Sequence, residues 1–195
     1  MASEKQSFLK AVKILIDTRE RKNNHITESL DELKIPYEQR KLDYGDYSFE
    51  VAGRDFSGLC VVERKADVLE LYGNVMEHRK DSQGRWIDIG ERIQQEFEAA
   101  SRNGAQLVLL IENCGSREEL KDYVLKDYEE TMCKNLKTKD IGKPVYERLK
   151  AWQTTNRYNF RIEYCADPKQ NSAAMILEEF YYWYHNYKKL IAPRR

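Results

Sequence analysis

The feature that most limits the possible folds is residues 105–113, AQLVLLIEN, the most apolar run in the chain. The run is too short to cross a membrane, and its side chains are apolar on both faces of an extended chain. It therefore predicts a central strand that is covered on both faces. Further strands are expected at 12–16, 59–63 and 159–165. Because such a sheet needs helices in two layers, the sequence predicts an α/β domain.

Amphipathic segments separate these apolar runs. Apolar residues recur at helical spacing in four segments, which are expected to be helices: residues 24–34, 66–76, 89–104 and 171–189. The predicted order of elements is β-α-β-β-α-α-β-α-β-α. This order describes a central mixed β-sheet flanked by α-helices.

Three segments are harder to assign from periodicity alone. Residues 37–53, YEQRKLDYGDYSFEVAG, are expected to form one extended strand with a kink at Gly45. Residues 78–85 are expected to be a polar loop. Residues 116–153 are charged and expected to be helical, with breaks at Gly142 and Pro144.

Length and charge suggest one domain with an uneven charge distribution. The 195 residues suit a single domain at 1–195 that carries a basic helical insertion at about 118–155. Lys plus Arg and Asp plus Glu both number 33, so the formal net charge is zero. Between residues 134 and 161, however, eight Lys or Arg residues face only two acids. A neutral total therefore does not exclude a nucleic-acid partner.

Cysteine usage and hydropathy indicate the compartment. The four cysteines are scattered without CxxC spacing, which argues against a zinc ribbon or a disulfide framework and favours a reducing environment. No signal-peptide core and no membrane-spanning run is present. We therefore expect a soluble protein without a membrane partner. Its location is expected to be cytoplasmic, at the nucleoid in a bacterium or phage host, or nuclear in a eukaryote.

The strand at 59–65 ends in the charged residues Glu63, Arg64 and Lys65. Glu63 and Lys65 lie two residues apart, so they point to the same face of a strand. Asp46 lies on the preceding strand, so the two carboxylates could converge on one Mg²⁺ or Mn²⁺ ion. Lys65 would then help to orient or deprotonate a water, or steady a phosphate. This is the D…(D/E)xK arrangement of metal-dependent nucleases; the alternative is a solvated strand end with a Glu–Lys pair.

Three ordered motifs add weight to the nuclease interpretation. They are LIDTRE (15–20), LDYGDY (42–47) and VERK (62–65). Together they resemble the nuclease domain of the XPF family of structure-specific endonucleases, which has a restriction-endonuclease-like core. QGR (83–85), LVLLIEN and NFRIEYCADPKQNSAAMILEEF resemble later parts of that domain. The resemblance covers most of residues 12–185, except a stretch around 118–155.

The resemblance implies roles for individual residues. Asp46 and Glu63 would be metal ligands, and Lys65 the catalytic lysine. Asp17 would be a further acid at the edge of the site, holding water or the outer shell of the metal. Arg85 would reach toward DNA, although a surface arginine is an equally simple interpretation.

The same resemblance assigns the charged residues beside these ligands. Arg19 and Arg64 would contact phosphate or brace the carboxylates, and Glu20 would orient the two arginines. The alternative for Arg19 and Glu20 is a surface ion pair of little energetic value.

The chain departs from the family pattern in two places. The family has an acid four residues after the lysine, where this chain has Leu69; Asp67 or Glu70 can substitute, since the two would share one face of a helix. The loop before Gly84 is longer than usual, and the tandem helix-hairpin-helix module of many relatives is absent. We therefore expect DNA to be bound in another way or through a partner.

Two further segments are candidate binding surfaces. The basic block contains the candidate DNA-binding residues Lys143, Arg148, Lys150 and Arg157. It also contains Tyr146, Trp152 and Tyr158, which could stack on unpaired bases. The alternative is a solvated helical pair.

The other segment is FYYWYHNY (180–187), which is dense in aromatic residues. Tyr181, Tyr182 and Trp183 point away from the predicted core stripe of that helix, so they could form a partner surface. The resemblance implies a homodimer or heterodimer through helices of the nuclease domain. The alternative is thicker local packing.

The expected function is a Mg²⁺- or Mn²⁺-dependent endonuclease that cuts branched, flapped or junction DNA in recombination or repair. One alternative is a less selective nuclease that trims or restricts DNA. Another is an inactive DNA-binding scaffold subunit, to which Leu69 lends some support. The joint presence of Asp46, Glu63 and Lys65 argues against the inactive scaffold, because such a subunit need not keep its nuclease residues.

Overall fold

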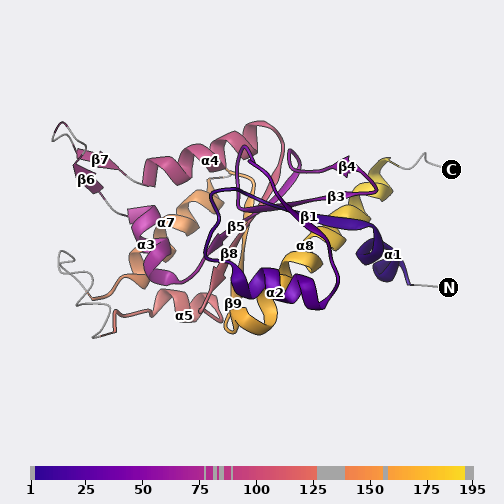
Figure 1. Cartoon of the computed structure of the whole chain (residues 1–195). Helices are drawn as coiled ribbons and strands as arrows, with labels where there is room; N and C mark the ends of the chain where they lie inside the picture. Colours follow the sequence, from indigo (N-terminus) through magenta and orange to yellow (C-terminus); the bar gives the residue numbers. More distant parts are fainter. Residues whose placement is uncertain are drawn as a thin grey trace.

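A seven-stranded mixed sheet forms the centre of the computed structural model, which describes residues 3–76, 78–80, 83, 86–88, 90–126, 139–155 and 158–191 (Figure 1). The strands run in the order β2-β1-β3-β5-β8-β9, and β4 pairs with β3. Their bounds are β1 Val12–Ile16, β2 Tyr37–Gln39, β3 Tyr47–Val51, β4 Arg54–Asp55, β5 Cys60–Lys65, β8 Gln106–Glu112 and β9 Phe160–Cys165. The β5, β8 and β9 strands are parallel, whereas β3 is antiparallel to β1 and β5.

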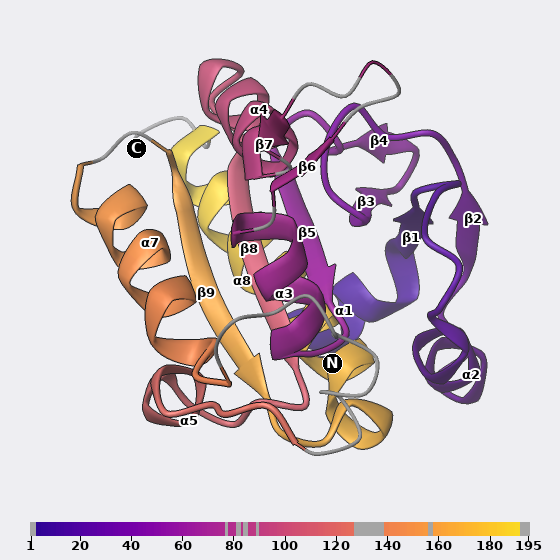
Figure 2. The ribbon, with the colours of Figure 1, turned by 90° about the vertical axis from the view of Figure 1, so that its left-hand side faces the viewer.

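Helices cover both faces of this sheet. One face carries α1 (Glu4–Ala11), α2 (Asn24–Glu32) and α8 (Pro168–Ile191). The other carries α3 (Val68–Met76), α4 (Gly90–Arg102), α5 (Arg117–Lys121) and α7 (Gly142–Thr154). Figure 2 shows α3 and α4 in front of β5 and β8, with α8 behind them. The predicted fold class, an α/β restriction-endonuclease-like core with a central mixed sheet between helices, is confirmed.

Strand alternation creates two separate cores and decides where the charged end of β5 points. Val62 packs in the core beneath α8, whereas Val61 packs in the core beneath α3 and α4. Because side chains alternate along a strand, Glu63 and Lys65 continue on the α3 and α4 face. Arg64 continues on the α2 and α8 face.

The structure corrects the expectation of one strand at 37–53. Residues 37–39 form β2, which is parallel to β1 on one side, and residues 47–51 form β3, which is antiparallel to β1 on its other side. The chain must therefore cross the end of β1, and the segment between β2 and β3 cannot stay in a ladder. Gly45 turns this segment with a φ of 71°, a conformation that glycine adopts without steric cost.

Other boundaries differ by smaller amounts. The expected helical stretch at 116–153 is interrupted, since residues 122–126 and 139–141 are not helical. Gly142 and Pro144 lie in the first turn of the new helix, α7, where proline fits. The expected polar loop at 78–85 contains β6 (His78–Lys80), which pairs with β7 (Trp86–Asp88). The α1 helix and β4 strand were not predicted, since neither carries a clear apolar period.

Most aromatic residues of α8 are half-buried and pack against the core beneath that helix. Tyr181 lies 5.6 Å from the ring of Phe8, and Trp183 lies 5.7 Å from the ring of Phe56. Tyr182 is 53% exposed. The packing of Tyr181 and Trp183 agrees with the alternative of thicker local packing, and only Tyr182 of these three presents a largely open ring.

Candidate active site

A cavity of about 290 Å³ lies at the carboxyl end of β5, where β3 begins. Side chains from five segments line it: Arg19, Glu20, Asp46, Glu63, Arg64, Lys65, Glu70, Asn74, Ile93 and Glu96. Every described residue that the LIDTRE, LDYGDY and VERK motifs assigned to the site, except Asp17, lines this cavity. Sequence motifs that are 15 positions or more apart therefore meet at one place.

Asp46 is held between two strands by its own backbone. Its N–H donates to the carbonyl of Val62 at 2.8 Å, and its carbonyl accepts from the N–H of Asp17 at 2.8 Å. Just before it, Gly45 packs so closely on β5 that a β-carbon there would lie 2.9 Å from Cβ of Val61. A glycine is thus required to bring the carboxylate of Asp46 to the end of β5.

Asp46 and Glu63 form a crowded pair of carboxylates. One oxygen of Asp46, Oδ2, accepts from the N–H of Arg64 at 2.8 Å. Burial, followed by the negative charge of Glu63, raises the pKa of Asp46 well above its ordinary value. The two acids therefore repel each other, and a bound cation would relieve that repulsion.

Lys65 lies against this pair. Its Nζ donates to Oε1 of Glu63 at 2.6 Å, and both side chains are buried. Burial alone would lower the pKa of Lys65, but the charges of Glu63 and Asp46 outweigh it and raise that pKa. Lys65 consequently remains an ammonium group that donates hydrogen bonds and supplies positive charge.

The donor set fits a hard divalent cation. Mg²⁺ in proteins commonly takes one or two carboxylates and keeps several waters. Asp46 and Glu63 each have a second oxygen that accepts no hydrogen bond from the described residues. Within the described ranges no three His, Cys, Asp or Glu side chains are grouped to hold a metal. In the described part of the chain, Asp46 and Glu63 would thus be the two protein ligands of the cation.

Asp17 is buried and already engaged by the protein. Its Oδ1 accepts from the N–H and Nε of Arg19, and its Oδ2 accepts from the N–H of Leu42 at 2.7 Å. Burial opposes ionisation, but these bonds outweigh it and lower the pKa of Asp17. The geometry therefore suits a brace for the loop that carries Asp46, rather than a metal ligand.

The acids that could replace the one missing at Leu69 cap α3. Oδ1 of Asp67 accepts from the N–H of Glu70 at 2.7 Å, and Oε2 of Glu70 accepts from the N–H of Ala66 at 2.8 Å. This arrangement resembles a capping box. Glu70 also lines the cavity, but the structure does not group it with Asp46 and Glu63 as a third ligand.

Arg64 lines the cavity, but its side chain extends away from the carboxylate pair, toward Glu20 and Glu112. Its Nη1 donates to Glu112 at 2.7 Å and its Nη2 to Glu20 at 3.0 Å, and the residue is only 4% exposed. Burial opposes its charge, but Glu112 and Glu20 outweigh that effect and raise the pKa of Arg64. Arg64 therefore braces the site. This agrees with the second of its two expected roles, which were to contact phosphate or to brace the carboxylates. Its expected contact with DNA stays a prediction, since Arg64 also lines the cavity.

Arg19 is the more accessible arginine of the site. Its side chain is 49% exposed, pairs with Asp17 and lies 3.7 Å from Glu96 of α4. Glu20 orients Arg64, whereas Asp17 orients Arg19. The expected orienting role of Glu20 thus applies to one of the two arginines.

Sequence reasoning did not identify Glu112 and its partners. Besides Arg64, Glu112 bonds to His25 at 2.9 Å and to Ser172 at 2.6 Å. The available signal was a carboxylate that ends the apolar run of 105–113, just as Glu63 ends the neighbouring run. Since β5 and β8 are parallel, with Arg64 beside Leu110, their charged ends had to meet at one edge of the sheet.

The candidate DNA-binding residues fall into three groups. Lys143 and Lys150 are exposed on α7. Arg148 is half-buried and donates to the carbonyl of Val75 near the end of α3. Arg85 and Arg157 lie outside the described residues.

The aromatic residues of the basic block are largely unsuited to stacking on bases. Trp152 and Tyr158 are buried, and their rings pack edge-on against Phe97 and against each other. Tyr146 is half-buried and packs against the same core. These positions agree better with a helical layer than with a stacking platform.

The fold and the site together define an α/β domain of the nuclease type, with paired carboxylates and a lysine at one sheet edge. A comparison with protein families matches residues 16–178 to the ERCC4 domain. The chain belongs to the ERCC4 domain family, which confirms the resemblance to the XPF-type nuclease domain. No curated protein matches the chain.

Proposed function

We propose that this chain is a metal-dependent endonuclease that hydrolyses phosphodiester bonds in branched, flapped or junction DNA. The observation that carries the proposal is the convergence of Asp46, Glu63 and Lys65 in one cavity. Membership of the ERCC4 domain family supports nuclease chemistry and a role in DNA repair.

Each residue of the site has a part in the proposed reaction. Asp46 and Glu63 would hold Mg²⁺ or Mn²⁺, which polarises a phosphoryl group and lowers the pKa of an attacking water. Lys65, as an ammonium group, would stabilise negative charge that develops on the phosphate. Arg19, half-exposed and held by Asp17, would position a phosphate oxygen. Hydrolysis would leave a 5′-phosphate and a 3′-hydroxyl.

Preference for branched DNA is the part of the proposal that rests on the family alone. A trimming nuclease would use the same site on any accessible strand. An inactive scaffold would bind DNA without cutting, and Leu69, where the family has an acid, is the feature that favours it. The intact pair of carboxylates with Lys65 favours activity.

The deciding experiment measures cleavage of a panel of labelled DNA. Duplex, single strand, 3′ flap, splayed fork and four-way junction are each incubated with Mg²⁺, Mn²⁺ or EDTA. Wild type is compared with Asp46→Asn, which removes a ligand charge while keeping the side-chain shape. We expect metal-dependent cutting of the branched forms that is lost in Asp46→Asn.

Each other outcome selects a different function. Equal cutting of every form would favour the trimming nuclease. Binding without cutting by either protein would favour the scaffold, and cutting in EDTA would contradict the metal-dependent chemistry.

The partners of the chain are also part of the proposal. No helix in the described part of the chain has the length and apolar character needed to cross a membrane. We infer that DNA is the main partner. A homodimer or heterodimer through the helices of this domain is also proposed, and light scattering of the purified chain tests self-association.

A further inference from the structure

A second cavity lies beside the candidate active site, on the α2 and α8 side of the molecule. Its volume is about 610 Å³, and we call it the α2–α8 groove. Its lining includes the cationic or titratable residues Arg21, Lys22, His25 and Lys169, and the acids Glu28 and Glu32. None of these residues was assigned a role by the sequence motifs.

Three cations of this groove are available to a ligand. Arg21, Lys22 and Lys169 are exposed, and their side chains take part in no hydrogen bond or ion pair with other described residues. The neighbouring arginines of the catalytic cavity behave differently, because Arg19 and Arg64 are both held by carboxylates. Unpaired Lys and Arg side chains gathered along one cavity are the usual means of neutralising phosphates.

The acids of the groove lie farther along α2. Glu28 and Glu32 follow His25 by about one and two helical turns. The first turn of α2 contains no acid, and no side chain caps it. Its N–H groups therefore add partial positive charge to the end that carries Arg21 and Lys22.

The groove is joined to the catalytic cavity by consecutive residues. Glu20 lines the catalytic cavity, whereas Arg21 and Lys22 line the groove. The Lys22 backbone is fixed from both sides, since its N–H donates to Glu20 at 3.0 Å and its carbonyl accepts from Arg64 at 3.1 Å.

The α2 wall of the groove is also tied to β5 through His25. His25 bonds to Glu112, which in turn accepts from Arg64. Lys22 and His25 are thus both anchored through Arg64, one residue from Glu63 and from Lys65. A strand held in the groove would have a fixed position relative to the carboxylate pair.

We propose that the α2–α8 groove binds the phosphodiester backbone of the DNA strand next to the phosphate that is cut. This inference rests on the proposed nuclease function. Glu20 of the catalytic cavity and Arg21 of the groove are consecutive, so their Cα atoms lie about 3.8 Å apart. A strand that leaves the carboxylate pair past Glu20 would therefore pass over Arg21 and Lys22. The exposed Lys169, at the start of α8, closes the groove from the other side.

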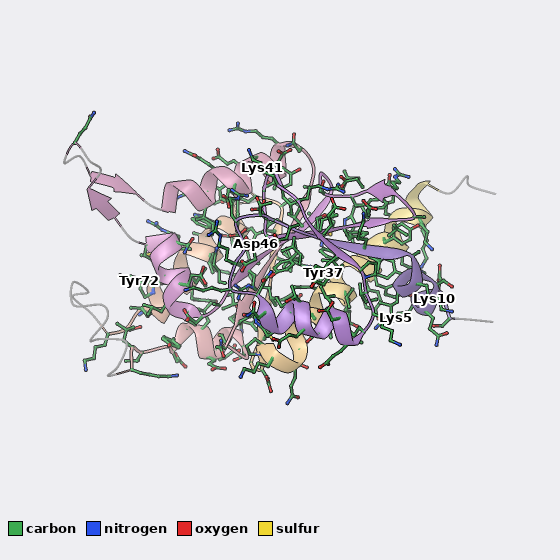
Figure 3. The ribbon with its side chains drawn as sticks, in the orientation of Figure 1. Lys5, Lys10, Tyr37, Lys41, Asp46 and Tyr72 are labelled. Carbon is green, nitrogen blue, oxygen red and sulfur yellow. The ribbon has the colours of Figure 1, made fainter. Side chains whose placement is uncertain are left out.

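The test is equilibrium binding of a fluorescent 3′ flap and a splayed fork in EDTA, measured by anisotropy at several salt concentrations. The variant is Arg21→Glu with Lys22→Glu. The matched control is Lys5→Glu with Lys10→Glu, which reverses two charges on α1, away from Asp46 (Figure 3). We expect the groove variant to bind about 10–100-fold more weakly and to lose about two units of salt slope. The control should stay much closer to wild type.

A second variant protects the test against misfolding. Glu28→Lys adds a cation to the groove at an exposed helical position, so we expect it to bind DNA more tightly than wild type. If Arg21→Glu with Lys22→Glu fails to fold by circular dichroism, the direction of change in Glu28→Lys decides.

The results separate the groove from the nuclease chemistry. If wild type cuts DNA but neither groove variant changes affinity or salt slope, the groove inference is wrong and the nuclease proposal stands. If wild type binds through the groove but cuts no substrate with either metal, the groove holds and the nuclease proposal fails. If wild type neither binds nor cuts DNA, both are overturned.

Discussion

The last three residues of β5 serve two unlike regions of the molecule. On the α3 and α4 side, Glu63 and Lys65 face a cavity together with Asp46. On the α2 and α8 side, Arg64 is enclosed by Glu20 and Glu112. Three consecutive charged residues are thus divided by strand alternation between an open cluster and a closed one.

The two clusters differ in how completely their charges are satisfied. In the closed cluster, both terminal nitrogens of Arg64 donate to carboxylates, and Glu112 also bonds to His25 and Ser172. The buried Nε of Arg64 has no hydrogen-bond partner among the described residues. In the open cluster, a buried Glu63 and a half-buried Asp46 lie beside one ammonium group, and the pKa of Asp46 is raised. The closed cluster therefore fixes the end of β5, and the open cluster retains the unfavourable charge that a metal ion would relieve. Arg64 thus contributes to stability, whereas its neighbours Glu63 and Lys65 contribute to the proposed catalysis.

The largest expected effect is on cleavage and comes from the open cluster. Asp46→Asn removes one of the two proposed metal ligands. Since a catalytic metal contributes several kcal/mol of transition-state stabilisation, and each 1.36 kcal/mol is a factor of ten, single-turnover cleavage should fall by about a thousandfold or more. Unchanged cleavage in Asp46→Asn would show that Asp46 is not a ligand.

The same substitution should have the opposite effect on stability. The pKa of Asp46 is raised by folding, so its stabilising contribution is present at low pH and is lost as pH rises through the folded-state pKa. Without metal, Asp46→Asn should therefore unfold at higher urea than wild type at neutral pH, and the gain should shrink in acid.

Asp17→Asn is the matched control, because folding lowers the pKa of Asp17. Its contribution is present at neutral pH and is lost as pH falls through the folded-state pKa. Asp17→Asn should therefore destabilise at neutral pH and approach wild type in strong acid. The same sign of change for both variants would contradict the contrast between the two carboxylates.

The closed cluster should dominate the stability measurements. Glu112→Ala leaves the buried Arg64 with one carboxylate and leaves Ser172 without its acceptor. Breaking a buried ion pair by removing one partner costs about 3 kcal/mol or more, measured as a lower free energy of unfolding in urea. Glu118→Ala removes an exposed carboxylate that pairs with Arg117, and it should have a much smaller effect.

A triple variant tests the origin of that cost. Arg64→Met with Glu112→Leu and Glu20→Gln removes the charge together with both of its carboxylate partners, so it should be less destabilised than Glu112→Ala. If Glu112→Ala is as stable as wild type, the closed cluster does not hold the end of β5.

The open cluster was visible in the sequence, whereas the closed one was visible only in part: Arg64 and Glu20 stand in the motifs, but Glu112 does not. Asp46, Glu63 and Lys65 stand in ordered motifs. The predicted strands at 12–16 and 59–63 lie close to the observed β1 and β5. Glu112 has no motif, and its contacts with Arg64, His25 and Ser172 join residues 48 to 87 positions apart. Such contacts follow from the parallel pairing of β5 and β8 and from the packing of α2 and α8. Periodicity predicts the elements, but it does not predict how they are arranged.

The loop that delivers Asp46 shows the same limit. Residues 37–53 read as one strand because polar and apolar residues alternate through much of the segment, although β1 separates its two halves in the sheet. Gly45 was expected at a kink, and its position is correct. The close approach to Val61, which makes the glycine necessary, depends on a strand that comes later in the chain.

Gly45→Ala should have an intermediate effect and should connect the two clusters. The position has a φ of 71°, and a β-carbon there would lie 2.9 Å from Cβ of Val61. Backbone strain of this kind costs about 1–3 kcal/mol, and the clash should also shift Asp46 and reduce cleavage. Gly53→Ala is the control, because its φ is 79° but nothing lies within 4 Å of the added carbon. Equal losses of stability and cleavage in both variants would show that the contact with Val61 is unimportant.

The smallest expected effect concerns whether the open cluster has a third acid. In Glu70→Gln the amide oxygen can still accept from the N–H of Ala66, so the free energy of unfolding should fall by less than about 0.5 kcal/mol, below the usual cost of losing a cap. Cleavage should change by no more than a few-fold, because Glu70 is not grouped with Asp46 and Glu63. Asp67→Asn, which alters the same cap, is the matched variant. A loss of cleavage in Glu70→Gln as large as that in Asp46→Asn, with Asp67→Asn unaffected, would make Glu70 the acid that replaces the one missing at Leu69. The cavity side would then hold three acids around its cation, and the contrast with the closed cluster would be greater than the present geometry indicates.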